Sequence, residues 1–250
     1  MELPLLGGGS GPTVLLCAAT AFEARLLARS LGLAPGRRPE PHLGPRIVLV
    51  RVGVGAPLLP ALPLPGVSPP VTALLGVGLC GGLAPAAVPG TVVVATAIQD
   101  AEGGKRPCHA GWGAMAHRAA VAGGVPLLGG PVFWSPRLLL GPEEKAAAAA
   151  TGAVAVDMES GPLSVFAADR GLPFAALRVV LDGPEEALPP ALADLIGPGG
   201  EVRGRRVLGL LGTRPGLAVA LVALAGRGRR ALGALGKVLA GILAEPRIGT

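Results

Sequence analysis

Over its first 182 residues the chain alternates short Val- and Leu-rich runs with helical stretches, and this alternation limits the possible fold more than any other feature. The apolar runs are too short for helices and several end in glycine, which is typical of buried strands in a parallel sheet. We therefore expect an α/β fold with a mostly parallel central sheet, helices on both faces and an active site at the strand ends. The predicted strands are residues 13–16, 46–52, 71–77, 91–95, 153–156 and 174–181.

Helices are expected between these strands, where start and stop residues frame them. They are residues 21–31, 142–150 and 160–170. After Pro189-Pro190 only helical patterns follow. We accordingly predict a main α/β domain of residues 13–190 and a helical C-terminal extension, residues 191–250, packed on that domain.

Composition excludes several classes of protein. Half of the 250 residues are apolar and 15% are charged, which suits a globular core and argues against a disordered chain. The three cysteines form no C-x-x-C pair, so we expect no zinc site and no disulfide framework. The N-terminus lacks the pattern of a signal peptide, and no apolar stretch reaches the length of a membrane-spanning helix. These features predict a cytoplasmic protein.

Positive charge is concentrated in the last fifth of the chain. Residues 201–250 contain nine basic and two acidic residues, whereas the net charge of the whole chain is +6. The basic residues are Arg203, Arg205, Arg206, Arg214, Arg227, Arg229, Arg230, Lys237 and Arg247. Two explanations remain open: solvated arginines on packed helices, or attraction to an anionic membrane surface at the inner face of the membrane. Nucleic acid is not expected as a partner, because stacking aromatics are absent there.

A glycine-rich block follows the third predicted strand. Gly76 to Gly81 satisfies G-x-G-x-x-G, but a dinucleotide site requires a helix to begin at the third glycine. Pro85 and Pro89 prevent that helix. We therefore expect a loop whose glycines let the backbone approach a small ligand or an anion, and a nucleotide-dependent oxidoreductase is only a distant alternative.

Five blocks, in this order and spacing, resemble the purine nucleoside phosphorylase/nucleosidase superfamily. They are Ala19–Glu23, Val52–Gly55, Gly78–Leu83, Val156–Ser160 and Arg178–Asp182. Within that superfamily the sequence is most similar to the hopanoid-associated phosphorylase group, also called adenosylhopane nucleosidase. The residues that carry this closer resemblance are Asp157–Ser160, Gly171–Ala175, Leu177–Val179 and Ala187–Ala191. The resemblance implies the three-layer nucleoside phosphorylase-like fold.

The resemblance also implies roles for particular residues. Asp182 would protonate the leaving purine, and its place after an apolar run favours a raised pKa. Glu159 would bind the ribose hydroxyls, Glu23 would activate the attacking water, and Met158 would lie under the sugar. The implied substrate-binding glycines are Gly53, Gly55, Gly78, Gly81 and Gly82.

Each of the three acids also has an ordinary structural explanation. Asp182 precedes Gly183-Pro184, which is common turn chemistry. Glu159 and Glu23 lie near predicted helix starts, where carboxylates favour the helix dipole. It is their joint occurrence in the order of the family that favours the catalytic interpretation.

The implied activity is cleavage of the N-glycosidic bond of a purine nucleoside, with 5′-adenosylhopane as substrate and adenine as product. No cofactor is expected, except that inorganic phosphate would be a co-substrate if the reaction is a phosphorolysis. Arg25, Arg51 and Arg137 are candidate phosphate ligands, but Glu23 in the same pocket would repel a phosphate dianion and so favours hydrolysis. The alternatives are a nucleosidase for another 5′-modified adenosine, such as methylthioadenosine, and a non-catalytic membrane-apposed scaffold. The family implies a homo-oligomer.

Overall fold

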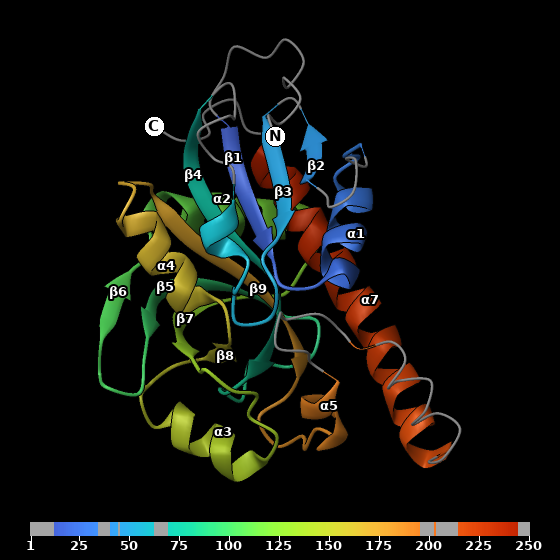
Figure 1. Cartoon of the computed structure of the whole chain (residues 1–250). Coiled ribbons are helices and arrows are strands. Elements are labelled where there is room, and N and C mark those ends of the chain that lie inside the picture. The colour runs from blue at the N-terminus through green and yellow to red at the C-terminus, as the bar shows by residue number, and fades with distance from the viewer. Residues whose placement is uncertain are drawn as a thin grey trace.

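The computed structural model describes residues 13–34, 41–44, 46–62, 70–195, 203 and 215–244, and these form a nine-stranded sheet flanked by helices (Figure 1). The strands are β1 (Thr13–Ala18), β2 (Pro41–Gly44), β3 (Ile47–Arg51), β4 (Val71–Gly82), β5 (Val92–Gln99), β6 (Lys105–Pro107), β7 (Leu127–Trp134), β8 (Ala155–Asp157) and β9 (Phe174–Asp182). The helices are α1 (Ala21–Ser30), the short 3₁₀ helix η1 (Leu59–Ala61), α2 (Ala110–Gly123), α3 (Pro142–Ala149), α4 (Ser160–Ala168), α5 (Ala191–Asp194) and α7 (Pro215–Leu243). The predicted α/β fold with a C-terminal helix is confirmed.

The sheet curls on itself. Its parallel pairs are β1–β3, β1–β4, β4–β9, β5–β7 and β7–β8, while β2–β3, β4–β8, β5–β6 and β5–β9 are antiparallel. The pairings among β4, β9, β5, β7 and β8 therefore form a closed ring, with β1, β3 and β2 continuing from β4. This closure brings the ends of β4, β8 and β9 next to one another.

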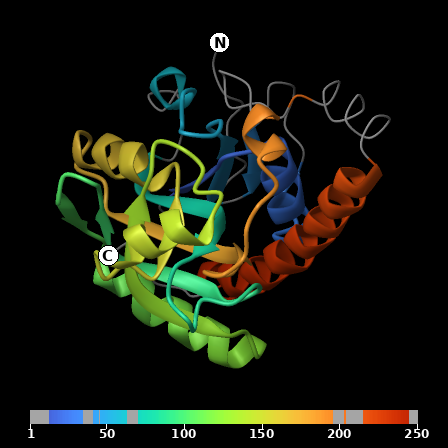
Figure 2. The ribbon, with the colours of Figure 1, turned by 90° about the horizontal axis from the view of Figure 1, so that it is seen from below.

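The strands bury both faces, as their continuous apolar runs predict. In β1, Val14 and Leu16 pack in the cluster that includes α1, α2 and α7, whereas Leu15 and Cys17 pack in the cluster that includes α4. The alternation follows from the two-residue period of a strand. Helices accordingly cover both faces of the sheet (Figures 1 and 2).

The C-terminal half of α7 lies against α1 and α2, and glycines allow this close approach. A Cβ atom on Gly236 would lie 2.5 Å from the Cβ of Ser30 in α1, and one on Gly241 would lie 2.8 Å from the Cβ of Ala119 in α2. The apolar face of this half, from Ala231 to Ile242, is buried. The N-terminal half extends past the rest of the molecule (Figures 1 and 2).

The structure corrects one sequence-based expectation. The segment from Gly78 to Gly82 was expected to be a loop, yet β4 continues through it to Gly82. Pairing with β8 and β9 on its two sides supplies hydrogen-bond partners that the local pattern does not reveal. Helix α2 and strand β7 were not predicted.

Candidate active site

Glu23 is fixed at the start of α1 by a capping box. Thr20 is the N-cap residue; its side chain accepts a hydrogen bond from the Glu23 amide at 3.2 Å, and its own amide and hydroxyl donate to Glu23 Oε2, each at 2.8 Å. The sequence Thr20-Ala21-Phe22-Glu23 has the S/T-x-x-E signature of this motif. The carboxyl group is thus held in one orientation, and Glu23 is 4% exposed.

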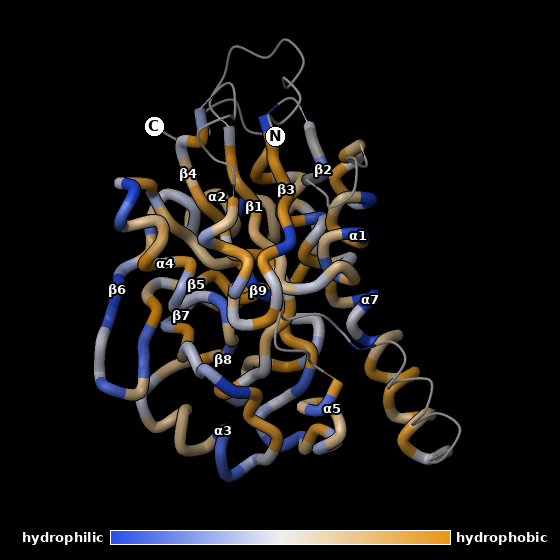
Figure 3. The backbone as a smooth tube through the Cα atoms, viewed as in Figure 1, coloured by the Kyte–Doolittle hydropathy of each residue, from blue (hydrophilic) through white to orange (hydrophobic). Residues whose placement is uncertain are grey.

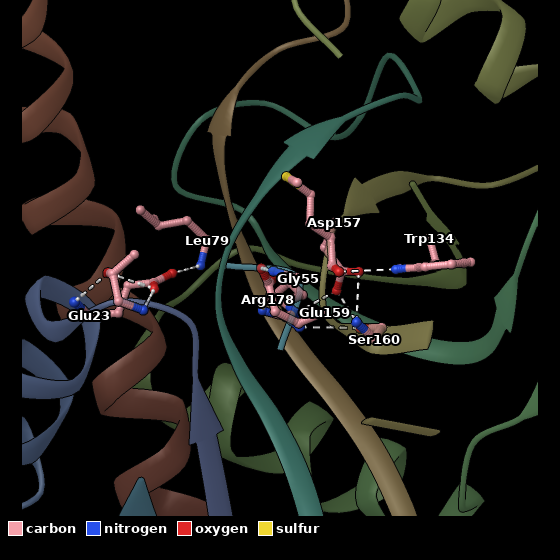
Figure 4. Close-up of polar contacts among 10 residues, drawn as sticks. Glu23, Gly55, Leu79, Trp134, Asp157, Glu159, Ser160 and Arg178 are labelled. Carbon is pink, nitrogen blue, oxygen red and sulfur yellow. Dashed lines mark hydrogen bonds and ion pairs between the residues drawn. The ribbon is translucent and has the colours of Figure 1, made fainter. Parts of the chain in front are cut away.

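The other oxygen of Glu23 points to the glycine segment of β4. The Leu79 amide donates to Glu23 Oε1 at 2.8 Å (Figure 4). At the preceding residue, Gly78, φ is +151°, and a Cβ atom there would lie 2.5 Å from Glu23 Oε1 and 3.2 Å from Arg178 Nη1. Glycine is therefore required at position 78 both by the backbone conformation and by the two charged groups beside it.

Arg178 is the centre of the charged cluster, and it is fully buried in β9. Its Nε lies 2.7 Å from Asp157 Oδ2, its Nη1 lies 3.5 Å from Glu159 Oε2, and its Nη2 donates to the Ser160 hydroxyl at 3.3 Å (Figure 4). Burial disfavours the guanidinium charge, but Asp157, Glu159 and Glu23 outweigh it and raise the pKa of Arg178. In the sequence, Arg178 is a charged residue within an otherwise apolar strand. This was a signal of a functional residue, but no role was predicted for it.

Asp157 in β8 supports this arginine. It accepts hydrogen bonds from the Ser160 amide, at 3.0 Å, and from the Ser160 hydroxyl. Both Asp157 and Ser160 are buried. Their contacts hold the turn from β8 into α4, on which Met158 and Glu159 lie.

Glu159 lies between a glycine turn and Arg178. The Gly55 amide, at a residue with φ of +74°, donates to Glu159 Oε1 at 3.0 Å. Burial raises the pKa of Glu159 to about 7 against the opposing effect of Arg178, and Asp157 and Glu23 add to the rise. This carboxyl group therefore changes its charge near neutral pH.

Asp182 ends β9 and pairs with a lysine. Lys145 Nζ, from α3, donates to Asp182 Oδ2 and also to the carbonyls of Gly183 and Glu186, both at 2.7 Å. Burial raises the pKa of Asp182, although Lys145 acts in the opposite direction. The turn after β9 has a further hydrogen bond, in which the Gly183 amide donates to the Glu186 side chain at 3.1 Å.

A small cavity of about 40 Å³ connects Asp182 with the β8–α4 turn. Its lining residues are Gly81, Arg137, Leu138, Leu139, Val156, Asp157, Met158, Asp182 and Leu188. A hollow of about 380 Å³ lies elsewhere, between β6, Trp134 and α4, and includes none of the three predicted acids. We place the candidate site at the smaller cavity because Asp182 and Met158 line it, and because Asp157, which also lines it, pairs with the arginine that Glu159 contacts.

The structure brings most of the predicted site residues into one region. Glu23 and Glu159 approach Arg178, while Asp182 and Met158 line the neighbouring cavity. Gly81 lies beside Asp182, since a Cβ atom on it would be 3.4 Å from Asp182 Oδ2. The remaining predicted glycines are Gly53, in the turn before Gly55, and Gly82, where a Cβ would lie 2.2 Å from the Ala87 carbonyl oxygen.

Of the basic tail, Arg205, Arg206, Arg214 and Arg247 lie outside the described residues. On α7, Arg229 and Arg230 are exposed, whereas Arg227 binds Glu186 Oε2 at 2.6 Å. None of the helices within the described residues is long and apolar enough to cross a membrane.

Comparisons with known proteins show which family and which solved structures this chain resembles. Residues 13–195 match the family described as the Phosphorylase superfamily. Among solved structures, the 5′-methylthioadenosine/S-adenosylhomocysteine nucleosidase of Helicobacter pylori has a TM-score of 0.69 at 14% identity, with 94% of this chain and 99% of that chain covered. The corresponding nucleosidase of Neisseria meningitidis has a TM-score of 0.67 at 17% identity, covering 93% and 99%. Futalosine hydrolase of H. pylori has a TM-score of 0.66 at 13% identity, covering 93% and 97%. Comparison with curated protein sequences gives no match.

Proposed function

This chain belongs to the Phosphorylase superfamily and is an enzyme that cleaves the glycosidic bond of nucleosides, and we propose that it releases adenine from a 5′-modified adenosine, with 5′-adenosylhopane as the substrate. The observation that carries the proposal is the placing of three buried acids along the end of β4. Glu23 and Glu159 lie on either side of the buried Arg178, and Asp182 lies beside Gly81 of β4. Buried acids are costly to the fold, which is why they concentrate at functional sites.

Asp182 is the proton donor in this proposal. Cleavage gives an oxocarbenium-like sugar and leaves negative charge on the purine, and protonation at N7 neutralises that charge. Its raised pKa keeps a proton available at higher pH than an exposed carboxyl would. The apolar side chains of Leu138, Leu139 and Leu188 beside it suit the faces of a base. A purine needs more than the cavity of about 40 Å³, so binding moves these segments apart.

Glu159 and Met158 hold the sugar. An ionised Glu159 accepts hydrogen bonds from the ribose hydroxyls and stabilises the positive charge that develops on the ring, while Met158 offers a soft apolar contact. A 2′-deoxy substrate should therefore react poorly, and Glu159→Gln should reduce this discrimination. Equal rates for ribo- and deoxyribonucleosides in both proteins would contradict the role of Glu159.

Water is the proposed nucleophile, with Glu23 as the base that activates it. A phosphate dianion would meet the repulsion of Glu23 and Glu159. The candidate phosphate ligands offer little compensation: Arg25 is exposed on α1, and Arg137 binds Glu144. Arg51 is half-buried at the end of β3. Inorganic phosphate is the co-substrate in the alternative reaction, phosphorolysis.

The preference for a lipid nucleoside rests on the resemblance to the hopanoid-associated group and on α7. From Gly216 to Gly226 this helix has no charged residue, and its Val219 and Val222 side chains are 71% and 68% exposed. Exposed arginines follow at positions 229 and 230, so positive charge comes directly after an apolar segment. Figure 3 shows the change from hydrophobic to hydrophilic residues along α7. An anionic membrane surface suits this combination.

The decisive experiment incubates the purified protein with 5′-adenosylhopane, methylthioadenosine and adenosine, and assays adenine with and without phosphate. We expect adenine and the free sugar in the absence of phosphate, with the lipid nucleoside as the best substrate. A strict phosphate requirement with a 1-phosphorylated sugar as product would replace hydrolysis by phosphorolysis. A preference for methylthioadenosine would identify the alternative substrate, and no adenine from any of them would favour the scaffold.

A further inference from the structure

The buried lysine beside Asp182 has no part in the reaction described so far. Lys145 is 1% exposed, although it lies in a helix that is otherwise largely alanine. An ammonium group has three protons to donate, and here they go to Asp182 Oδ2 and to the carbonyls of Gly183 and Glu186. All three acceptors belong to the end of β9 and the turn after it, so this lysine is directed at the acid.

The geometry leaves one carboxyl oxygen of Asp182 free for a ligand. Oδ2 is taken by Lys145, whereas Oδ1 has no hydrogen-bond partner within the described part of the chain. Asp182 also lines the cavity. We propose that Lys145 is the positioning residue of Asp182: by holding Oδ2 it turns Oδ1 toward the base and stabilises the carboxylate that remains once the proton has left.

This inference rests on the proposed function. The proton on Asp182 Oδ1 moves to N7 of the purine, and the electron pair of the breaking C–N bond stays on the base. Asp182 becomes a carboxylate next to the Lys145 ammonium, which keeps its three protons. The positive charge of the Lys145 ammonium stabilises the Asp182 carboxylate that forms in this step, so it makes Asp182 a stronger acid.

Other charged groups also face Asp182, and their effects oppose one another. They are Glu186 from the following turn, Arg227 from α7, and Asp157 and Arg137 around the cavity, and the neutral Cys80 thiol from β4 is a further titratable group there. Burial and Glu186 raise the pKa of Asp182, while Lys145 and Arg227 lower it. Of these cations only Lys145 touches the carboxyl group. Removing Lys145 should therefore raise the pKa of Asp182 further and make the transfer of its proton to the base less favourable.

The test compares Lys145→Gln with Lys145→Arg, and uses Lys105→Gln on exposed β6 as a matched control. We expect the kcat/KM for adenine release to fall along one limb of the pH profile, as the pH rises and Asp182 loses its proton. In Lys145→Gln we expect this limb to move up by about 1–3 pH units, together with a lower kcat at the plateau. Lys145→Arg should keep the limb of the wild type, as should Lys105→Gln. An unmoved limb in a folded Lys145→Gln protein would overturn the proposal.

A second measurement does not depend on whether Lys145→Gln folds. The chain contains three lysines, Lys105, Lys145 and Lys237, and only Lys145 is buried. With ¹⁵N-labelled lysine, we expect one ammonium signal protected from exchange, which shifts in Asp182→Asn and on addition of adenine. A protected signal that responds to neither would refute the role of Lys145. Failure of the wild type to release adenine would instead refute the proposed function, whatever this signal does.

Discussion

Asp182 can be tested by a change that keeps its shape. Asp182→Asn removes the proton donor but preserves the volume of the side chain. The asparagine amide can donate a hydrogen bond to the base, but it cannot transfer a proton to it. We expect kcat for adenine release to fall by about 10²-fold or more. Asp169→Asn, on the exposed end of α4, is the matched control. Near-normal turnover in Asp182→Asn would remove this residue from the mechanism.

Glu159 should weaken the fold at neutral and alkaline pH. Its pKa, raised by burial to about 7, means that the folded protein holds this proton more tightly than the unfolded chain does. The stabilisation is complete below the pKa of the unfolded chain and is lost as the pH rises through about 7. At alkaline pH, Glu159→Gln should therefore raise the free energy of unfolding by on the order of 1–3 kcal/mol, and by less at acidic pH. Urea denaturation at the two pH values measures the difference, and an equal effect at both would contradict it.

Gly78 offers a test of how Glu23 is placed. Gly78→Ala puts a methyl group where the Glu23 carboxyl now lies and also strains the backbone. We expect kcat to fall by at least about 10-fold, because a small displacement of a catalytic group is costly. Gly129→Ala in β7 is the control, since a Cβ atom there meets nothing within 4 Å. Equal activities of the two variants would show that Gly78 does not fix the site.

The sequence pointed to the three acids of the candidate site, but not to the two basic residues that bind them, Lys145 and Arg178. The roles of Glu23, Glu159 and Asp182 were predicted from blocks that resemble a known family in their order, and they stay predictions, although the structure buries all three side chains. Lys145 was not found: it reaches Asp182 across 37 residues of sequence, and an isolated lysine in an alanine-rich helix gives no periodic signal. Arg178 was noticed only as part of a strand, because its role depends on the closure of the sheet around it.

At the scale of elements, α7 is tied to the turn that follows Asp182. Arg227 Nη1 lies 2.6 Å from Glu186 Oε2, and the same oxygen accepts from the Gly183 amide. Arg227→Gln should therefore lower kcat a few-fold, while stability changes by less than about 1 kcal/mol because the pair is partly exposed. Arg229→Gln, two residues further on the exposed side, is the control. Equal kcat values for the two variants would contradict a link between α7 and the site.

The elements that local pattern predicted well are those with strong local signals. Helix α3 begins at Pro142, as expected from the proline and the two acids of its first turn. Strand β4 was ended too early, at Val77, because glycines normally weaken a strand; here β8 and β9 hold it on both sides. The closed ring of strands has no counterpart in the sequence pattern, since it depends on pairings between distant segments.

For the whole molecule, the proposed membrane contact predicts salt-sensitive binding to anionic vesicles. Changing Arg229 and Arg230 to Gln should weaken cosedimentation by roughly 1 kcal/mol per charge, and changing Val219 and Val222 to Ser should weaken it through lost apolar contact. Turnover of a soluble nucleoside should not change in either variant. Binding that is absent from the wild type, or unaffected by salt, would leave packing as the explanation of the basic tail.

The glycine contacts of α7 determine where this helix tolerates changes in length. Gly228 faces Phe22 at the start of α1 together with Leu79 and Leu181, whereas Gly236 faces the end of α1 and Gly241 faces α2. One residue inserted between Gly228 and Gly241 would rotate the part of the helix on one side of the insertion by about 100° relative to the other part. Larger side chains could then reach the positions of Gly236 and Gly241, where a Cβ atom does not fit. An insertion before Gly226 disturbs none of these contacts. Length variation within this family of sequences should therefore gather in the first three turns of the helix and stop abruptly at Arg227.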